Sequence, residues 1–230
     1  MKILPQAFGL MFALAAFAAT NEPPSQTVSD PQPILHDLQR KMSSVNSVYL
    51  EFTQERVLKL FSAPLKSEGV MLIERPDKIR WETTAPYQTI LLGDKNSVAQ
   101  FEFNDGRWEK LKLGFPQLLQ HVMQQMSAMN QGRLDALTND FFASVATNGE
   151  TVVTMIPKDE NMRGMMSSLE VHMQPDFSAT REIVLNEPDG DLTRIIFQNE
   201  KRGVKFQAGT FDQAKPLAIA AVQTAVKNAP

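Results

Sequence analysis

Apolar residues recur at helical spacing near the start of the folded part of the chain. They are Ile34, Leu35, Leu38, Met42 and Val45. Residues three or four apart lie on one side of a helix, and two prolines with Ser29 or Asp30 stand just upstream, as is usual where a helix begins. We therefore expect an amphipathic helix over residues 34–45.

The period of the pattern changes to two directly after this helix. In residues 47–55, Val48, Leu50 and Phe52 fall on one face of a strand, and the residues between them fall on the other. Similar strands are expected over residues 69–75, 79–84, 88–93 and 98–104, separated by turns of Gly, Pro, Asp and Asn. Such short connections leave no room for crossover helices, so neighbouring strands run antiparallel.

The spacing becomes helical again between Phe115 and Val145. One apolar stripe consists of Leu118, Leu119, Val122, Met123, Met126 and Met129, and a second consists of Leu134, Leu137, Phe141, Phe142 and Val145. Gly132 lies between the stripes and is expected to interrupt the helical segment.

Strands resume after this region, over residues 150–157, 168–174, 180–187, 192–199 and 203–207. The Asp189-Gly190 pair suits a hairpin turn between two of them. The order of helix, strands, helices and strands predicts an α+β fold, and a sheet with so many strands must twist and curl.

The two ends of the chain differ in composition from the rest. Residues 1–19 carry Lys2, an apolar run and small residues near Ala19, which is typical of a cleaved signal peptide and of a periplasmic protein. A membrane anchor is the alternative, but the run is shorter than the roughly 20 residues needed to span a bilayer. Residues 20–33 read as a flexible leader, and residues 212–230 as an Ala-rich tail.

Composition and charge exclude several classes of function. The chain has no cysteine, so disulfides and thiolate metal sites are excluded. Its net charge of −3 gives it no broad attraction for phosphates, which argues against nucleic-acid binding. His36, His121 and His172 lie far apart, and no nucleophile motif or phosphate loop is present, so we expect neither a metal site nor catalysis.

Methionine is the one residue type that suggests a binding role. The chain has 12 methionines, of which Met123, Met126 and Met129 share one helical stripe, and Met165 and Met166 lie in a predicted loop. Methionine side chains adapt to irregular apolar shapes and are common on surfaces that accept variable apolar ligands. They fill protein cores equally well, and a single stripe does not distinguish the two uses.

An ordered series of motifs runs through the chain. Phe52-Thr53-Gln54 follows the first helix, and after it come Gly69, RPDKIRW (residues 75–81), Pro86, ILLGD (residues 90–94) and FPQLL (residues 115–119). In this order and spacing the motifs resemble the LolA family of periplasmic carriers of outer-membrane lipoproteins. The resemblance covers residues 34–211.

The resemblance implies an incomplete, half-open antiparallel β-barrel of about eleven strands, with α-helices forming a lid over an apolar cavity. The cavity would shelter the acyl chains of a lipoprotein that an inner-membrane exporter supplies and an outer-membrane receptor accepts. No cofactor is implied, and we expect a monomer. The residues expected to line the cavity are Leu50, Phe52, Trp81, Leu118, Leu119, Val122, Met123 and Met126.

Arg75 matches a particular residue of the resembling family. There, the arginine before the proline contacts backbone carbonyls of the lid helices and keeps the empty form closed. A guanidinium offers five donors in a rigid fork, which suits several carbonyls at once. The alternatives are that Arg75 is an ordinary turn residue and Trp81 an ordinary core residue.

Some stretches depart from the family pattern and leave other functions open. Lys95 and Asn96 follow Asp94 where the carriers usually have Gly and a Trp–Tyr pattern, and the tail replaces a proline-rich final strand. The stretch LFSAPLKSEG (residues 60–69) is similar to LolA-like partners of other lipid exporters, which carry glycolipids or lipid-linked pigments. A non-carrier scaffold or sensor domain of the envelope, and a lipid-ester hydrolase, are the remaining alternatives.

Overall fold

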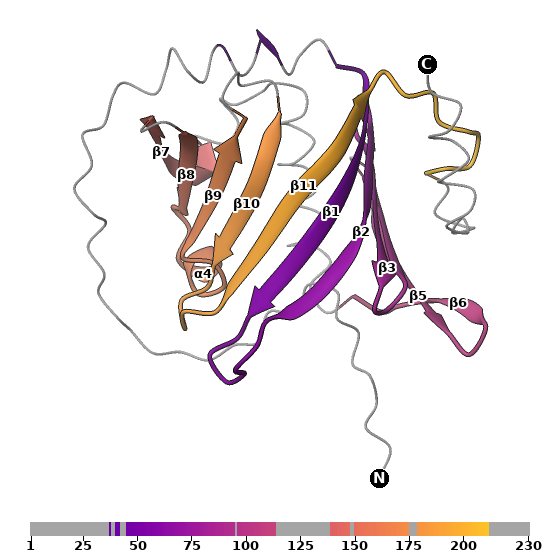
Figure 1. The fold of residues 1–230 in the computed structure, drawn as a ribbon, viewed down its shortest axis with the longest axis horizontal. Helices are drawn as coiled ribbons and strands as arrows, with labels where there is room; N and C mark the ends of the chain where they lie inside the picture. The colour runs from indigo at the N-terminus through magenta and orange to yellow at the C-terminus, as the bar shows by residue number, and fades with distance from the viewer. Residues whose placement is uncertain are drawn as a thin grey trace.

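The described part of the chain forms one antiparallel sheet of eleven strands in a computed structural model (Figure 1). The structure describes residues 37, 40–41, 45–94, 96–113, 139–147, 150–174 and 179–211. Its elements are β1 (Ser47–Val57), β2 (Leu65–Glu74), β3 (Lys78–Ala85), β4 (Thr89–Gly93), β5 (Val98–Asn104), β6 (Arg107–Lys110), β7 (Phe141–Thr147), β8 (Thr151–Pro157), α4 (Glu160–Arg163), β9 (Ser168–Met173), β10 (Thr180–Asn186) and β11 (Leu192–Arg202).

The strand order across the sheet is β6-β5-β4-β3-β2-β1-β11-β10-β9-β8-β7. Each half of the sheet is a meander in which consecutive strands pair. The halves meet where β1 pairs with β11 and Phe52 lies opposite Phe197. This central pairing leaves β6 and β7 as the two edges, so the predicted sheet of eleven antiparallel strands is confirmed and is not closed.

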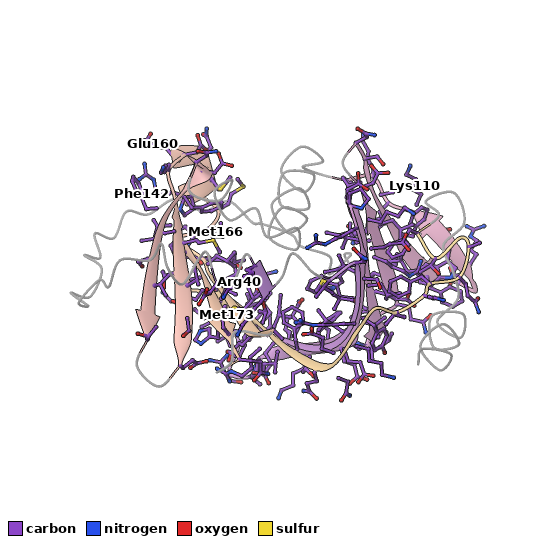
Figure 2. The ribbon with its side chains drawn as sticks, turned by 90° about the horizontal axis from the view of Figure 1, so that it is seen from above. Arg40, Lys110, Phe142, Glu160, Met166 and Met173 are labelled. Atoms are coloured by element: carbon purple, nitrogen blue, oxygen red, sulfur yellow. The ribbon has the colours of Figure 1, made fainter. Side chains whose placement is uncertain are left out.

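The sheet is strongly curved (Figure 2). Register shifts between Tyr49 and Glu51, between Glu68 and Gly69, and between Thr180 and Glu182 interrupt the ladders. Such irregularities bend a strand and increase its twist. We call the side that carries Val48, Leu50 and Phe52 the inner face, and Figure 2 shows Met166 and Met173 on this side of the curve.

Residues 203–211, which follow β11, cross the outer face of the sheet over β1–β3. The Gly203 N–H donates to the Ser47 carbonyl (3.0 Å), and the Ser47 hydroxyl donates to the Val204 carbonyl (2.7 Å). Val204, Phe206 and Phe211 pack there with Tyr49 and Leu72. The prediction of a strand over residues 203–207 is therefore wrong. The preceding strand β11 already pairs with β10 on one side and with β1 on the other, so it cannot also pair with a strand that directly follows it.

The prediction of a helix is also wrong for the last three residues of the second stripe, Phe141, Phe142 and Val145. These residues belong to β7, in which Phe141 and Val145 are buried on one face and Phe142 is exposed on the other. Positions four residues apart share a face in a strand as well as in a helix, so this spacing does not separate the two structures. Pairing with β8 makes the segment a strand.

Two short elements were not expected from the sequence. The strand β6 pairs with β5 through a turn in which Asp105 and Gly106 both have positive φ (49° and 82°). The helix α4 precedes Met165 and Met166, where the pattern had predicted only a loop; the carboxylate of Asp159 caps it by accepting from the Met162 N–H (2.9 Å). The predicted hairpin turn at Gly190 is confirmed, with φ of 84°.

Several predicted segments lie outside the described residues. They are residues 1–19, 20–33 and 212–230, most of the helix over residues 34–45, and the region from 114 to 138 that was expected to supply the lid. Asp37, Arg40 and Lys41 of the expected first helix are helical, and Val45 at its end packs against the inner face. Over the described ranges, no helix is long and apolar enough to cross a membrane.

Candidate functional site

The inner face of β1–β3 carries a compact apolar surface. Leu50 pairs with Met71 across β1 and β2, and Met71 pairs with Trp81 across β2 and β3, so the three side chains form a row. The rings of Phe52 and Trp81 lie with their centroids 4.6 Å apart. Leu50 and Phe52 are almost fully buried, and Trp81 is half-buried.

Gly69 makes room for the Phe52 ring. A Cβ atom at position 69 would lie 2.7 Å from the Phe52 Cζ and 2.0 Å from the Glu82 backbone oxygen. Both distances are far below van der Waals contact, and the second involves backbone that cannot swing away. Glycine at this position therefore lets the aromatic ring lie across the second strand of the inner face.

A second apolar cluster covers the inner face of the other half of the sheet. Its buried members are Phe141, Val145, Val153, Met155, Met166, Val171 and Met173. Ile183 of β10 packs against this cluster and also against the cluster of Phe52. The two clusters thus form one continuous apolar face that extends from β7 to β4.

Sequence reasoning identified only part of this face. Leu50, Phe52 and Trp81 come together in one cluster, and their role in lining a cavity stays a prediction. The other predicted lining residues, Leu118, Leu119, Val122, Met123 and Met126, lie outside the described residues. Ile79, Ile183, Ile195 and Phe197 also belong to this face and were not predicted. Ile79 lies two residues before Trp81 on the same strand, so alternation alone contained its signal. Ile183, Ile195 and Phe197 needed the register across β1, β11 and β10 to be assigned to the inner face.

Arg75 lies at the turn between β2 and β3. Its backbone N–H donates to the Asn46 carbonyl (2.8 Å), just where the chain enters β1. Burial lowers the pKa of the Arg75 guanidinium, whose side chain is half-buried. The residues that it was predicted to hold lie outside the described part of the chain, so its role as a latch stays a prediction.

The outer face of β3 carries a buried ion pair that the alternation pattern did not reveal. Arg80 and Glu82 are both completely buried, although acidic strand positions were interpreted as a solvated face. Arg80 donates to the Glu82 Oε2 from Nε (2.9 Å) and Nη2 (2.6 Å). Burial lowers the pKa of Arg80 and raises that of Glu82, and the attraction between them opposes both shifts.

Polar clusters elsewhere on the described chain have structural partners. His172 Nδ1 lies 3.1 Å from Glu150 Oε1, and its Nε2 lies 3.6 Å from Glu170 Oε2. Glu187, Asp189 and Asp191 bring carboxylate oxygens within 4.8 Å of one another, but Arg56 pairs with Glu187 (3.3 Å) and backbone amides bind the two aspartates. These contacts account for the three carboxylates as parts of a tight turn.

Comparison with known proteins gives one consistent family. A family model described as "Outer membrane lipoprotein carrier protein LolA" matches residues 43–214. The outer-membrane lipoprotein carrier protein of Methylococcus capsulatus is 24% identical over 197 residues, which cover 85% of this chain and 88% of that protein. The protein of the same name from Pseudoalteromonas translucida is 21% identical over 188 residues, covering 79% and 83%.

Among solved structures, a LolA superfamily protein from Nitrosomonas europaea aligns with 72% of this chain and 91% of its own, at 9% identity and a TM-score of 0.37.

Proposed function

The chain belongs to the LolA family of outer membrane lipoprotein carrier proteins, and on this basis we propose that it is a periplasmic carrier of acylated molecules. In this proposal the inner face of the sheet shelters the acyl chains of a lipoprotein or of a related lipid. The protein receives its cargo from an exporter in the inner membrane and delivers it to a receptor at the outer membrane. It acts as a monomeric chaperone, without a cofactor and without catalysing a reaction.

The continuous apolar inner face is the observation that carries this proposal. It extends over both halves of the sheet through Ile183. An apolar surface of this width is stable in water only when it is covered, either by the protein's own side chains or by hydrocarbon. The carrier proposal requires that acyl chains replace part of that cover when cargo is bound.

The energy of such an exchange suits a carrier. Burying hydrocarbon is worth about 0.8 kcal/mol per CH₂, so an acyl chain of ordinary length gains on the order of 10 kcal/mol before the costs of ordering it. A carrier must also release its cargo. Displacing a segment that covers the inner face costs part of this gain. The net binding free energy is then small enough for the carrier both to take up and to release its cargo.

The chain's two tryptophans allow a direct test, because they lie on opposite faces. Trp81 packs on the inner face beside Phe52, whereas Trp108 packs on the outer face with Ile90, Leu92 and Phe101. Trp108→Phe leaves Trp81 as the sole tryptophan, and Trp81→Phe leaves Trp108. We expect a fatty acid brominated along its chain to quench the fluorescence of Trp81 and to leave that of Trp108 nearly unchanged.

Equal quenching of both variants, or quenching of neither, would contradict binding at the inner face. Mass spectrometry of lipids that co-purify from the periplasm then identifies the cargo and separates lipoproteins from glycolipids and lipid-linked pigments. A protein that takes up no acylated molecule would instead be a scaffold or sensor. Release of free fatty acid from a bound ester would indicate a hydrolase.

A further inference from the structure

All large hydrophobic residues that are exposed in the described part of the chain lie at one end of the sheet. They are Val57, Leu60, Phe61, Tyr87, Phe103 and Phe142. Because the strands alternate in direction, β1, β3, β5, β8 and β10 finish at this end, and β2, β4, β6, β7, β9 and β11 begin there. Figure 1 shows the β1–β2 hairpin, the β5–β6 hairpin and α4 along this lower side. We call it the apolar end.

The opposite end of the sheet is polar in the described residues. Its described turn residues include residues 75–77 between β2 and β3, residues 94 and 96–97 between β4 and β5, and Gly203 after β11. None of the exposed large hydrophobic residues of the described chain lies in these turns. The described ends of the sheet therefore differ in polarity, although both consist of short turns between strands.

The β1–β2 hairpin presents two strongly exposed apolar side chains, one of which is the most exposed large hydrophobic residue of the described chain. Leu60 is 95% exposed and Phe61 is 58% exposed. The turn is closed by a hydrogen bond from the Phe61 N–H to the Leu58 carbonyl (2.9 Å), and the Lys59 N–H donates to Asp191 Oδ1 of the neighbouring β10–β11 turn (2.9 Å). These bonds hold the tip in place, so exposure of Leu60 and Phe61 is a property of an ordered hairpin.

Charged groups accompany the apolar side chains. The Lys158 ammonium lies 5.3 Å from the centre of the Phe142 ring, and Arg107 stands next to the turn that follows Phe103. Aromatic rings beside lysine or arginine are typical of side chains at a membrane interface. Exposed acids such as Asp105 and Glu160 lie at the same end, so the attraction to lipid headgroups is not dominated by positive charge.

We propose that the apolar end docks on the interfacial zone of a phospholipid bilayer, with Leu60 and Phe61 inserted among the acyl chains. The exposed apolar side chains lie in turns (Leu60, Phe61 and Tyr87) or near the ends of strands (Val57, Phe103 and Phe142), and they are spread from β5 near one edge of the sheet to β7 at the other. A protein partner binds best to a contiguous patch with a buried centre, whereas a bilayer accepts shallow insertions at separate points. The inference goes beyond carrier activity and does not depend on it, since a scaffold with this end would dock in the same way.

The absence of cysteine from the chain makes a site-specific probe simple. Leu60→Cys and, as a matched control at the opposite end, Asn96→Cys are each labelled with an environment-sensitive fluorophore on the exported protein. Both positions are exposed. On addition of vesicles of phosphatidylethanolamine and phosphatidylglycerol, we expect a blue shift and a rise in intensity for the label at position 60 and no change at position 96.

A partition measurement gives an independent result. The double substitution Leu60→Ser and Phe61→Ser should lower vesicle binding by about tenfold or more, because the free energy gained by burying two apolar side chains in the bilayer is lost. The control pair Asn96→Ser and Lys201→Ser should bind within about twofold of the unchanged protein. Because apolar insertion dominates, binding should change little between low and moderate salt.

Three results would overturn the proposal. They are a response at both labels or at neither, unchanged vesicle binding after the double substitution, and a response of the label at position 60 to a membrane protein in detergent but not to protein-free vesicles. The last would assign the apolar end to a protein partner. Quenching of Trp81 by a brominated fatty acid should persist in the double variant, so failure of membrane docking remains distinguishable from failure of carrier activity.

Discussion

Arg80 donates a hydrogen bond from Nη1 to the backbone carbonyl of Thr210, 130 residues later in the chain (3.1 Å). The same guanidinium pairs with Glu82 on its own strand, and both Arg80 and Thr210 are almost completely buried. The contact ties the segment after β11 to the outer face of β3. A charged residue at an alternating strand position thus acts as a buried link between two distant parts of the chain.

The first prediction concerns the balance of this ion pair. Arg80→Met should lower the free energy of unfolding by about 3–5 kcal/mol, because it leaves the Glu82 carboxylate buried and unpaired. Arg80→Met combined with Glu82→Leu should recover much of the loss. Urea unfolding followed by circular dichroism measures both. The matched control is Arg107→Met, since Arg107 pairs with Glu109 in the same two-residue spacing but on the surface, where the cost should be at most about 1 kcal/mol.

The same variants give a pH dependence with a defined sign. Burial raises the pKa of Glu82, and removal of Arg80 takes away the neighbour that opposes this rise. A raised carboxyl pKa means that the folded state holds a proton that the unfolded state has lost, so stability falls as pH rises above the unfolded pKa of about 4.3. The gap in stability between the single and double variants should therefore shrink as pH falls from 7 to 5. A constant gap would show that the Glu82 charge is not responsible.

The second prediction concerns Gly69. Gly69→Ala should lower the free energy of unfolding by about 1–3 kcal/mol or more, because the new methyl group meets the Phe52 ring and the β3 backbone. Gly164→Ala is a suitable control, since Gly164 has an ordinary helical φ of −66°. The displaced Phe52 ring should also alter the near-ultraviolet circular dichroism of Trp81. An unchanged spectrum together with unchanged stability would contradict the tight fit described for these residues.

The third prediction concerns Tyr49 at alkaline pH. Burial under residues 203–211, followed by the neighbouring Glu51 charge, raises the pKa of Tyr49. The folded state therefore keeps a proton that the unfolded state loses above the usual tyrosine pKa of about 10, and stability should fall by about 1.4 kcal/mol per pH unit above that value. Tyr49→Phe should remove this part of the alkaline loss. Unfolding titrations at several pH values from neutral to alkaline compare the two proteins, and parallel curves would contradict the assignment.

The fourth prediction concerns Arg75. Arg75→Leu should leave the sheet folded, as judged by the thermal unfolding midpoint, and should impair transfer of cargo from carrier to acceptor membrane. Lys201→Leu removes an exposed cation at the same end of the sheet and should leave transfer intact. Full transfer by the Arg75→Leu protein would count against the latch, and loss of folding would show instead that Arg75 is a structural residue of the β2–β3 turn.

Local patterns in the sequence were sufficient for most of the strands. The alternation at Val48, Leu50 and Phe52 predicted β1, and the short Gly, Pro and Asp turns predicted antiparallel pairing. These features depend only on neighbours along the chain, because side chains in a strand alternate between two faces wherever the strand lies. The ordered motifs from Phe52 to residue 119 indicated the family for the same reason, because their order and spacing are properties of the sequence alone.

Other features were decided only when distant segments met. The sequence alone determined which residues of a strand share a face, but the pairing of β1 with β11 decided which residues join Leu50 and Phe52 on the inner side. Arg80 is buried where residues 203–211 cross the outer face and Thr210 accepts its hydrogen bond, and Phe141–Thr147 is a strand because β8 offers it a partner. Burial and strand pairing depend on contacts with segments that are distant in the sequence, and a local periodic pattern contains no information about those contacts.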